Sequence, residues 1–430
     1  MRITVIGAGY VGLTTGICFS HLGHHVLVVE KLPEKVAMLK DGKLPIYEPG
    51  LEDLLLENLS RKRISFTTSV EESVGFSDVV FISVGTPQNQ DGSADLSQVE
   101  EVARTVATHM ESYKLLVEKS TVPVNTHKLI KKTVLRSIKR EVDFDVASNP
   151  EFLREGSAVR DFLEPDRIVV GVESERAKDL FKEVYKDIKA PIIFTDPATA
   201  ELIKHASNSF LAMKISFINM IADLCEKTGA DIKLVADGMG YDKRIGRSFL
   251  NAGVGWGGSC FPKDVKAFIK IAENYGVDFS LLKEVERINI SRVKRFIEKV
   301  QDVLWSLKGK KLALWGLAFK PDTDDIREAP SLKIVSGLLE QGAKVYAYDP
   351  KAMENFKRVF PKINYGNSMY EVLKDADALL IITEWEEFLK ADLFKVKSLM
   401  RLPIIIDGRN VYEPSYVREF GFEYYPMGRS

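Results

Sequence analysis

The sequence has few cysteines, no long apolar run and no excess of charge of either sign. Its 430 residues include 3 cysteines. A disulfide framework needs more cysteines and an even number of them, so we expect reduced thiols in a reducing compartment. No apolar run reaches the ~18 residues of a membrane-spanning helix. Glycines interrupt the apolar N-terminus too soon for a signal peptide. A cytoplasmic protein is therefore expected.

The charge balance excludes a further class of function. Lysine and arginine number 60, aspartate and glutamate number 61, and the formal net charge is −1. A protein that binds nucleic acid or an anionic membrane surface has a basic excess, which is missing here. The hydrophobic fraction of 45% and the charged fraction of 28% are instead typical of a globular protein. Its length indicates about three domains, since a domain averages ~150 residues.

Two regions of the chain alternate short apolar strands with helical patterns, as in a doubly wound parallel sheet. In the first region we expect strands at 2–6, 25–30, 78–84, 114–118 and 144–147. In the second we expect strands at 312–315, 343–349 and 377–382 and a helix at 331–341. Segments 20–26 and 339–345 share a pattern, as do 78–82 and 377–382. The second region is therefore predicted to duplicate the first.

A helical region separates these two regions. One helical pattern without glycine or proline extends from 198 to 228, and a glycine-rich stretch from Gly253 to Gly258 precedes a further helix near Asp264. We therefore predict an α/β protein in which two Rossmann-like doubly wound domains are joined by a mostly helical middle domain. The expected domain boundaries are 1–195, 196–305 and 306–430.

A dinucleotide-binding motif follows the first predicted strand. Gly7, Gly9 and Gly12 form G-x-G-x-x-G between a strand and a helix, and Glu30 ends the next strand. The glycines permit the tight turn and let a pyrophosphate approach the helix N-terminus, while an acid at this place binds ribose hydroxyls and repels a 2′-phosphate. We therefore expect NAD rather than NADP. The alternative is a turn that only packs the helix on the strand.

The duplicated region lacks this motif, because residues 316–320 read Gly-Leu-Ala-Phe-Lys. A second NAD site is not expected there. Lys320, Arg327 and Arg409 still fall in loops beyond the predicted strand ends, where cations suit the phosphates of a nucleotide. Solvated loop charges are the alternative interpretation.

A cysteine follows the glycine-rich stretch of the middle region. Cys260 stands at the start of a predicted helix, close to Lys263 and one helical turn before Asp264. A helix N-terminus and a nearby cation favour the thiolate, and glycines let a ligand approach the backbone. Cys260 is therefore the candidate nucleophile. Cys18 and Cys225 lie in apolar helical patterns and are expected in the core.

A nucleophilic thiol beside a nicotinamide site has a chemical consequence. NAD alone oxidises an alcohol to an aldehyde, whereas a thiolate can add to the aldehyde, give up a second hydride as a thiohemiacetal and leave a thioester for hydrolysis. The combination predicts a four-electron oxidation of an alcohol to a carboxylate. Lys204 and Asn208, one turn apart on the long predicted helix, are candidates for proton acceptor and oxyanion donor. A solvated helix face is the alternative. We expect no metal site, because no cluster has the spacing of metal ligands.

In its motifs the whole chain resembles the UDP-glucose/GDP-mannose dehydrogenase family. The motifs are GAGYVG at 7–12, SVGTP at 83–87, EKSTVP at 118–123, NPEFLREG at 149–156, the segments 201–208 and 320–327, and GGSCFPKD at 257–264. The resemblance implies oxidation of UDP-glucose at C6 to UDP-glucuronate with two NAD, through a cysteine thiohemiacetal and thioester. It also implies a homodimer joined through the middle helices.

The resemblance implies roles for individual residues. Cys260 would be the nucleophile. Lys204 and Asn208 would stabilise or deprotonate the oxygen at C6, and Asp264 with Thr121 would order the water for hydrolysis. The residues implied in cofactor binding are Gly7, Gly9, Tyr10, Val11, Gly12, Glu30, Lys35, Thr86, Thr121, Glu155, Lys263 and Arg327.

The implied substrate site overlaps the catalytic residues. Glu151 would lie nearer the hydrolytic chemistry and Glu155 nearer the nicotinamide, while Arg244 would reach the substrate of the partner subunit. The residues implied in substrate binding are Glu151, Phe152, Leu153, Glu155, Lys204, Asn208, Arg244, Phe249, Leu250, Asn251, Gly253, Gly257, Cys260, Phe319, Lys320 and Arg409.

Three alternatives remain at this point. The first is the same chemistry on GDP-mannose or another UDP-hexose, although Ser259 stands where members acting on N-acetylated UDP-sugars tend to have histidine. The second is a 3-hydroxyacid dehydrogenase, which transfers one hydride and needs neither Cys260 nor a third domain. The third is a non-catalytic NAD-binding scaffold, which the presence of all the candidate catalytic groups disfavours.

Overall fold

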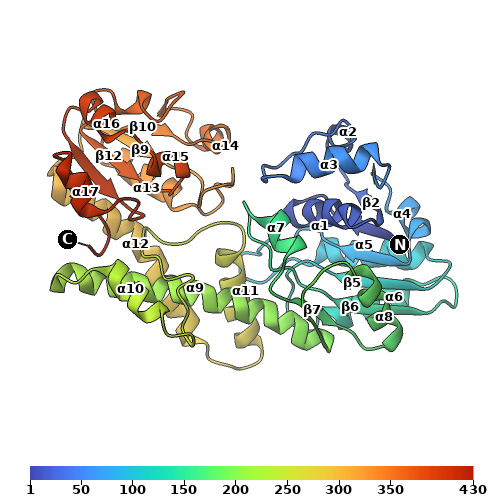
Figure 1. Cartoon of the computed structure of the whole chain (residues 1–430). Coiled ribbons are helices and arrows are strands. Elements are labelled where there is room, and N and C mark those ends of the chain that lie inside the picture. The colour runs from blue at the N-terminus through green and yellow to red at the C-terminus, as the bar shows by residue number, and fades with distance from the viewer. Residues whose placement is uncertain (430) are drawn as a thin grey trace. The chain divides into compact units, whose positions relative to one another are not determined.

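The computed structural model describes residues 1–429 and divides into two compact units (Figure 1). Unit 1 comprises Met1–Ser207 and Lys266–Val277, and unit 2 comprises Asn208–Val265 and the chain from Asp278 onward. The two units are described separately below. The predicted division into three domains with boundaries near 195 and 305 stays a prediction.

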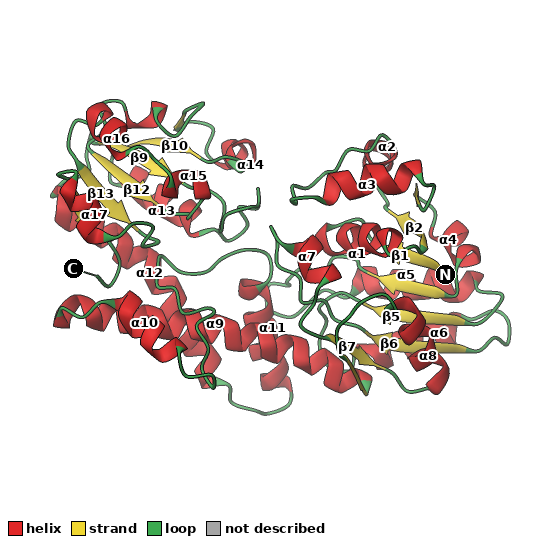
Figure 2. Cartoon of the chain, viewed as in Figure 1, coloured by secondary structure: helices red, strands yellow, loops and turns green. Residues whose placement is uncertain are grey.

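Unit 1 is built on an eight-stranded sheet in the order β3-β2-β1-β4-β5-β6-β7-β8. Neighbouring strands are parallel except β6 and β7. The strands are β1 Arg2–Ile6, β2 His25–Val29, β3 Ile64–Thr67, β4 Val79–Ile82, β5 Lys114–Glu118, β6 Phe144–Ser148, β7 Ile168–Gly171 and β8 Ile192–Thr195. The helices among them are α1 Tyr10–His21, α2 Pro33–Lys40, α3 Leu51–Ser60, α4 Val70–Phe76, α5 Ser97–His109, α6 Thr126–Ser137, α7 Ala158–Leu163 and α8 Glu175–Val184 (Figure 2).

The strands of this sheet are apolar on both faces because helices cover both. In β4, Val79 and Phe81 belong to the core shared with α1 and α3, whereas Val80 and Ile82 belong to the core shared with α5 and α6. Alternate side chains of a strand point to opposite faces, so continuous apolar runs are the pattern of a doubly covered parallel sheet. The predicted core position of Cys18 is confirmed, since its side chain is fully buried.

Unit 2 contains a six-stranded parallel sheet in the order β11-β10-β9-β12-β13-β14. Its strands are β9 Lys311–Trp315, β10 Lys344–Tyr348, β11 Asn364–Tyr365, β12 Ala378–Ile381, β13 Ile404–Asp407 and β14 Glu423–Tyr425. Its shorter helices are α13 Pro330–Glu340, α14 Met353–Val359, η1 Glu371–Leu373, α15 Glu386–Leu389, α16 Leu393–Leu399 and α17 Pro414–Glu419. The strand order repeats that of the first six strands of unit 1, so the predicted duplication and fold class are confirmed.

Between the two sheets the chain is helical, with α9 Pro197–Thr228, α10 Ile232–Gly240, α11 Phe261–Asn274 and α12 Ser280–Leu304. The long helix predicted at 198–228 matches α9 closely, because no glycine or proline interrupts it. The helix expected near Asp264 begins at Phe261, directly after Cys260, so the predicted place of Cys260 at the start of a helix is confirmed. Cys225 of α9 is buried, as predicted. Across residues 1–429, every helix is too short or too polar to span a membrane.

Candidate active site

The turn between β1 and α1 has the backbone geometry that dinucleotide binding requires. Gly7 has φ +107°, and a Cβ on it would stand 2.4 Å from the carbonyl oxygen of Ser83. A Cβ on Gly12 would meet the Gly7 carbonyl oxygen at 1.8 Å, so both positions exclude any larger residue. Gly9, in contrast, has open space around its Cβ position. Open backbone at a helix N-terminus is where a pyrophosphate binds.

The acid expected at the ribose lies where the sequence predicts it. Glu30 follows β2 and is nearly buried, and its carboxylate accepts a hydrogen bond from the Leu32 amide at 3.1 Å. Lys35 Nζ is 4.0 Å from this carboxylate. Two further residues predicted to bind the cofactor are linked by a hydrogen bond: Thr86 Oγ1 donates to the Thr121 carbonyl oxygen at 3.0 Å.

One residue at this turn escaped sequence reasoning. Glu48 is buried, and its carboxylate accepts hydrogen bonds from the Tyr10 hydroxyl, from the Gly156 amide at 2.6 Å and from the Ala158 amide at 2.7 Å. It therefore joins the dinucleotide turn to the loop that contains Glu155. Glu48 is the single acid of the loop 44–50 before α3, and nothing in that loop marks it as a site residue.

Lys204 and Glu151 form a buried ion pair in unit 1. The Lys204 Nζ is 2.9 Å from Glu151 Oε1 and 2.7 Å from the Glu151 carbonyl oxygen. The other carboxylate oxygen accepts from the Leu153 amide at 2.6 Å, and the Phe152 ring lies 5.4 Å from Nζ. A buried pair needs such additional bonds because both charges have lost their hydration. These bonds fix the position of the Lys204 amine, which can then act there as a charge or as a hydrogen-bond donor.

A second buried lysine near this pair was not predicted as a site residue. Lys119 lies in the EKSTVP motif directly after β5, and its Nζ is 3.1 Å from Asn149 Oδ1. Burial lowers the pKa of Lys119 to about 7; the Lys204 charge adds to the effect and the Glu151 charge opposes it. A lysine that titrates near neutral pH inside a protein is a candidate for proton transfer. The motif was recognised, but burial could not be predicted from it.

In unit 2, Asn208 and Asp264 form a hydrogen bond that the sequence analysis did not predict. Asn208 Nδ2 donates to Asp264 Oδ2 at 2.7 Å, and Lys263 Nζ is 2.9 Å from Asp264 Oδ1. The carbonyl oxygen of Cys260 accepts the Asp264 amide at 2.8 Å, which places Cys260 at the N-cap position of α11. The thiol is partly exposed, with the Ser259 hydroxyl 3.6 Å from its sulfur.

The glycine loop before Cys260 is shaped by close backbone contacts. A Cβ on Gly257 would lie 2.2 Å from the Glu328 carbonyl oxygen, and one on Gly258 would lie 2.7 Å from the Phe319 ring. Gly258 also has φ +87° and donates its amide to the Arg327 carbonyl oxygen at 2.9 Å. Within unit 2, the Cys260 loop therefore packs on the loops that follow β9.

The cations expected at the second sheet lie beyond the carboxyl ends of its strands. Arg409 follows β13, and its guanidinium donates to the Ile382 carbonyl oxygen at 2.8 Å and to the Phe319 carbonyl oxygen at 3.3 Å. Lys320 Nζ is 5.7 Å from the Phe319 ring centroid. Arg327 forms a bidentate pair with Asp325. This edge is where ligands bind in open α/β sheets.

The turn after β9 repeats the first turn but is filled by a side chain. Gly316 has φ +96° and donates to the Tyr348 carbonyl oxygen at 2.9 Å, as Gly7 does to Val29. The fully buried carboxylate of Asp349 accepts the amides of 317 and 318 at 2.7 and 3.0 Å. It also accepts the amides of 351 and 352 and the Trp385 indole. An anion already occupies the place of a pyrophosphate, which agrees with the expectation of a single NAD site.

The remaining predicted substrate residues differ in accessibility. The Arg244 side chain is 89% exposed and pairs with Asp242. Phe249 has φ +65° and lies 6.2 Å from the Phe261 ring. Leu250 is buried in a helical core, with 2% of the residue exposed. Asn251 Oδ1 accepts from a neighbouring arginine.

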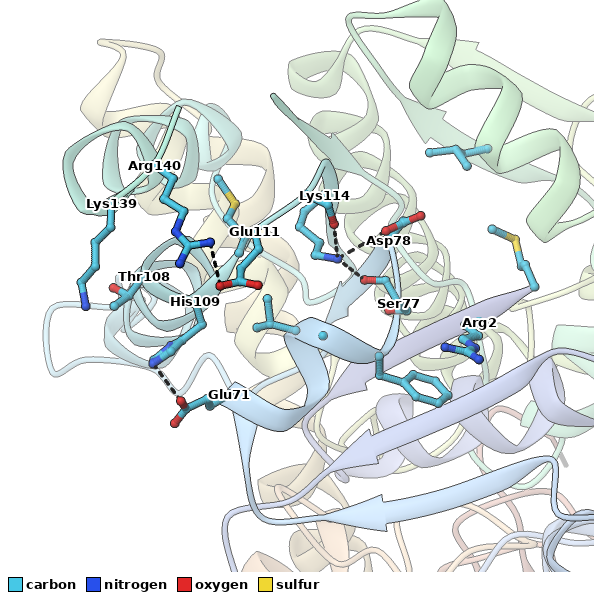
Figure 3. A pocket seen from close by; sticks show the side chains of 17 residues that line it. Arg2, Glu71, Ser77, Asp78, Thr108, His109, Glu111, Lys114, Lys139 and Arg140 are labelled. Carbon is cyan, nitrogen blue, oxygen red and sulfur yellow. Dashed lines mark hydrogen bonds and ion pairs between the residues drawn. The ribbon is translucent and has the colours of Figure 1, made fainter. Parts of the chain in front are cut away.

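A cavity of about 840 Å³ in unit 1 lies away from the predicted site (Figure 3). It opens at the amino ends of β1, β4 and β5, opposite to the edge at which a doubly wound sheet binds its ligand. Its buried cation, Lys114, donates to the Ser77 carbonyl oxygen at 2.7 Å and to Asp78 at 3.3 Å. Arg140 pairs with Glu111. No predicted site residue lines this cavity.

Comparisons with known proteins cover the entire chain. Three models of the UDP-glucose/GDP-mannose dehydrogenase family match, namely its NAD binding domain at residues 1–189, its central domain at 198–291 and its UDP binding domain at 313–414. A UDP-glucose 6-dehydrogenase of Rhizobium meliloti is 46% identical, with 100% of both chains covered. One of Bacillus subtilis is 44% identical, with 100% of this chain and 93% of the relative covered.

Solved structures agree with these matches. A UDP-glucose dehydrogenase from Pyrobaculum islandicum has a TM-score of 0.93 at 41% identity, with 100% of this chain and 98% of that chain covered. A UDP-D-ManNAc dehydrogenase from Pyrococcus horikoshii has a TM-score of 0.88 at 30% identity, with 100% and 99% covered. The likeness extends over the two sheets and the helices between them.

Proposed function

Since this chain belongs to the UDP-glucose/GDP-mannose dehydrogenase family and begins with its NAD-binding domain, we propose that it oxidises UDP-glucose at C6 to UDP-glucuronate. NAD, its cofactor, accepts hydride when bound. In balance, one primary alcohol, two NAD⁺ and one water give a carboxylate, two NADH and three protons. The curated relatives named UDP-glucose 6-dehydrogenase support this choice of sugar.

Cys260 is the nucleophile in this proposal. Its sulfur bonds to the aldehyde carbon, the resulting thiohemiacetal gives up a hydride, and a thioester remains. Water then attacks the thioester carbonyl, the carbon–sulfur bond breaks and the thiolate leaves. The single observation that carries this role is the position of a partly exposed Cys260 at the N-cap of α11, a 14-residue helix whose N-terminus favours the thiolate.

Lys204 and Asn208 act on the oxygen at C6. The ammonium of Lys204, fixed by Glu151, and the amide of Asn208, fixed by Asp264, are donors of the kind that stabilise a developing oxyanion. Asp264 with Thr121 orders the hydrolytic water, and Glu151 contributes to the same step. Because both donors are already oriented by neighbours, little reorganisation is needed at the moment of reaction.

The binding residues are assigned by the motifs they occupy. NAD would be held by Gly7, Gly9, Tyr10, Val11, Gly12, Glu30, Lys35, Thr86, Thr121, Glu155, Lys263 and Arg327. The nucleotide sugar would be held by Glu151, Phe152, Leu153, Glu155, Phe249, Leu250, Asn251, Gly253, Gly257, Phe319, Lys320 and Arg409. The carboxyl-end position of Arg409 supports the second assignment.

A homodimer is part of the proposal. Phe210, Phe217 and Leu224 recur every seven residues on α9 and are 49–58% exposed, and Met220 lies between them on the same side. Exposed apolar stripes of this size mark interaction surfaces. A second copy of the chain is the proposed occupant, and the exposed Arg244 would reach its substrate. A cytoplasmic location is proposed on the low cysteine content.

The test is the amount of NADH formed for each UDP-glucose consumed, with GDP-mannose and N-acetylated UDP-hexoses in parallel. We expect two equivalents from UDP-glucose, and the Cys260→Ala variant should produce no carboxylate. One equivalent, or turnover that survives Cys260→Ala, would instead support a single-step dehydrogenase of the 3-hydroxyacid type. Activity on GDP-mannose alone would keep the chemistry and replace the sugar.

A further inference from the structure

The segment between β5 and α6, residues 119–127, carries Thr121 and is attached to α9 at two places. Both attachments come from the turns of α9 around Lys204, and all of these residues belong to unit 1. One is made by Glu201, three residues before Lys204, and the other by His205, the residue after it.

Glu201 binds the C-terminal part of this segment. Its Oε2 accepts the Asn125 amide at 2.5 Å, and its Oε1 accepts the His127 amide at 2.9 Å and the His127 Nδ1 at 3.0 Å. The side chain is buried to 2% exposure. Asn125 has φ +74°, a left-handed conformation in which asparagine is enriched among non-glycine residues. The carboxylate therefore fixes both this turn residue and the first turn of α6.

His205 binds the N-terminal part. Its Nε2 lies 2.7 Å from the Val122 carbonyl oxygen and so must donate to it, which defines the tautomer. The ring is buried and stacks on Phe268, with centroids 5.6 Å apart. Val122 is the neighbour of Thr121, whose own carbonyl oxygen accepts from Thr86 Oγ1. The main chain is thus held at the carbonyl groups of two successive residues, Thr121 and Val122.

A further buried acid distinguishes the two carboxyls in this region. Burial raises the pKa of Glu118 well above its ordinary value, and the charge of Glu201 adds to the effect. Burial also raises the pKa of Glu201, but the bonds from His127 and Asn125 oppose it. Three N–H donors converge on Glu201, so the charge of the pair resides there. An uncharged amide at 201 could not accept on both of its terminal atoms.

We propose that Glu201 and His205 are positioning residues that hold Thr121 in a fixed place relative to Lys204 and thereby set the rate of the hydrolytic step. This inference rests on the proposed function, in which Thr121 orders the water that attacks the thioester. A displacement of about 1 Å at a reacting group can lower a rate on the order of a hundredfold. Neither side chain need touch the substrate for this effect.

The step at issue balances without any further reactant. The oxygen of water bonds to the thioester carbon, and the bond from that carbon to the Cys260 sulfur breaks. Both protons of the water are released, which leaves a carboxylate and the Cys260 thiolate. If Thr121 is displaced, this step slows while hydride transfer to form the thioester continues. The enzyme then accumulates as the covalent thioester.

The experiment compares Glu201→Gln and His205→Phe with the intact enzyme and with Lys114→Met as a matched control. Lys114→Met also breaks buried hydrogen bonds, but at the opposite edge of the sheet. His205→Phe keeps an aromatic ring against Phe268 and loses only the N–H donor. Each protein is mixed with UDP-glucose and NAD, quenched with acid and weighed intact, and its kcat and KM are measured.

We expect kcat to fall roughly tenfold or more in Glu201→Gln, with KM changed by less than about threefold, and an adduct of UDP-glucuronyl mass to accumulate. His205→Phe should show a smaller fall of the same kind, and the conservative His205→Gln, which retains an N–H donor, should recover most of the loss. Lys114→Met should lower the melting temperature without accumulating the adduct.

The inference would be overturned if both variants lost activity without the adduct, or if the control accumulated it equally. If Glu201→Gln fails to fold, His205→Phe decides alone. If the intact enzyme forms no two NADH per UDP-glucose, the proposed function itself fails. If the intact enzyme does so and the variants match the control, only the positioning role fails.

Discussion

Replacing Lys119 by methionine should make unit 1 more stable and remove part of its pH dependence. Lys119 is 5% exposed, and burial lowers its pKa from 10.5 to about 7. That difference corresponds to about 5 kcal/mol of disfavoured charge at pH values below 7, an upper bound because the variant also loses the bond to Asn149. Asn149 Oδ1 retains the Tyr185 hydroxyl as a donor at 2.5 Å, so it is not left unsatisfied.

The sign of the pH effect follows from proton binding. Between pH 7 and 10.5 the unfolded chain holds a proton on Lys119 that the folded chain has released, so the free energy of unfolding rises with pH across that window. From pH 7 to pH 9 the intact protein should therefore gain roughly 2 kcal/mol relative to Lys119→Met. Below pH 7 the difference between the two should be constant and largest.

The assay must report on unit 1. All four tryptophans, Trp256, Trp305, Trp315 and Trp385, belong to unit 2, so intrinsic fluorescence would follow the wrong part of the molecule. Hydrogen–deuterium exchange of the buried amides of β5, corrected for intrinsic rates, measures the opening free energy beside Lys119. Lys128→Met, at an exposed position of α6, is the matched control for the loss of one charge. Parallel pH profiles for Lys119→Met and the intact protein would refute the reasoning.

Three further predictions concern unit 2. Phe217→Glu should convert the proposed dimer into a monomer in sedimentation velocity, whereas Lys227→Glu on the same helix should not; a monomeric intact protein would contradict the proposal. Asn289→Ala removes two hydrogen bonds to the Trp256 backbone, at 2.8 and 2.9 Å. The loss of about 1–2 kcal/mol of binding free energy should raise KM for the nucleotide sugar about 5- to 30-fold, with kcat little changed. An unchanged KM would refute this. Asp349→Ala should lower the free energy of unfolding by roughly 3 kcal/mol or more and shift tryptophan emission, because Trp385 loses its acceptor; an unshifted spectrum would count against it.

Much of the architecture could be predicted from local patterns. Strand β5 and helix α9 lie within one residue of their predicted bounds, because continuous apolar runs and uninterrupted helical periodicity are local signals. The duplication was predicted from the likeness of the second region to the first, and the two sheets share their strand order over six strands. The predicted place of Cys260 at the start of a helix is confirmed, and Pro262 in the first turn of that helix is a residue that favours a helix start.

The site was only partly predictable for a physical reason. Glycines and the nucleophile are marked by residue type, but burial and hydrogen-bond partners depend on distant segments. Glu48, Lys119 and Glu201 are ordinary charged residues in the sequence, and each acquires its role from partners far along the chain. Contacts 76 residues apart, such as Glu201 with Asn125, have no local signature.

Because Asp349 fills the turn after β9, the stability of the two copies of the fold should depend on a bound ligand to different degrees. The free amides of the first turn gain an anionic partner only when a ligand is bound, so the heat resistance of its copy should rise with the logarithm of the cofactor concentration. The second turn receives an equivalent anion from Asp349, which is attached to the same chain and present at all times. The stability of the first copy should thus depend on the supply of cofactor, whereas the stability of the second copy should not.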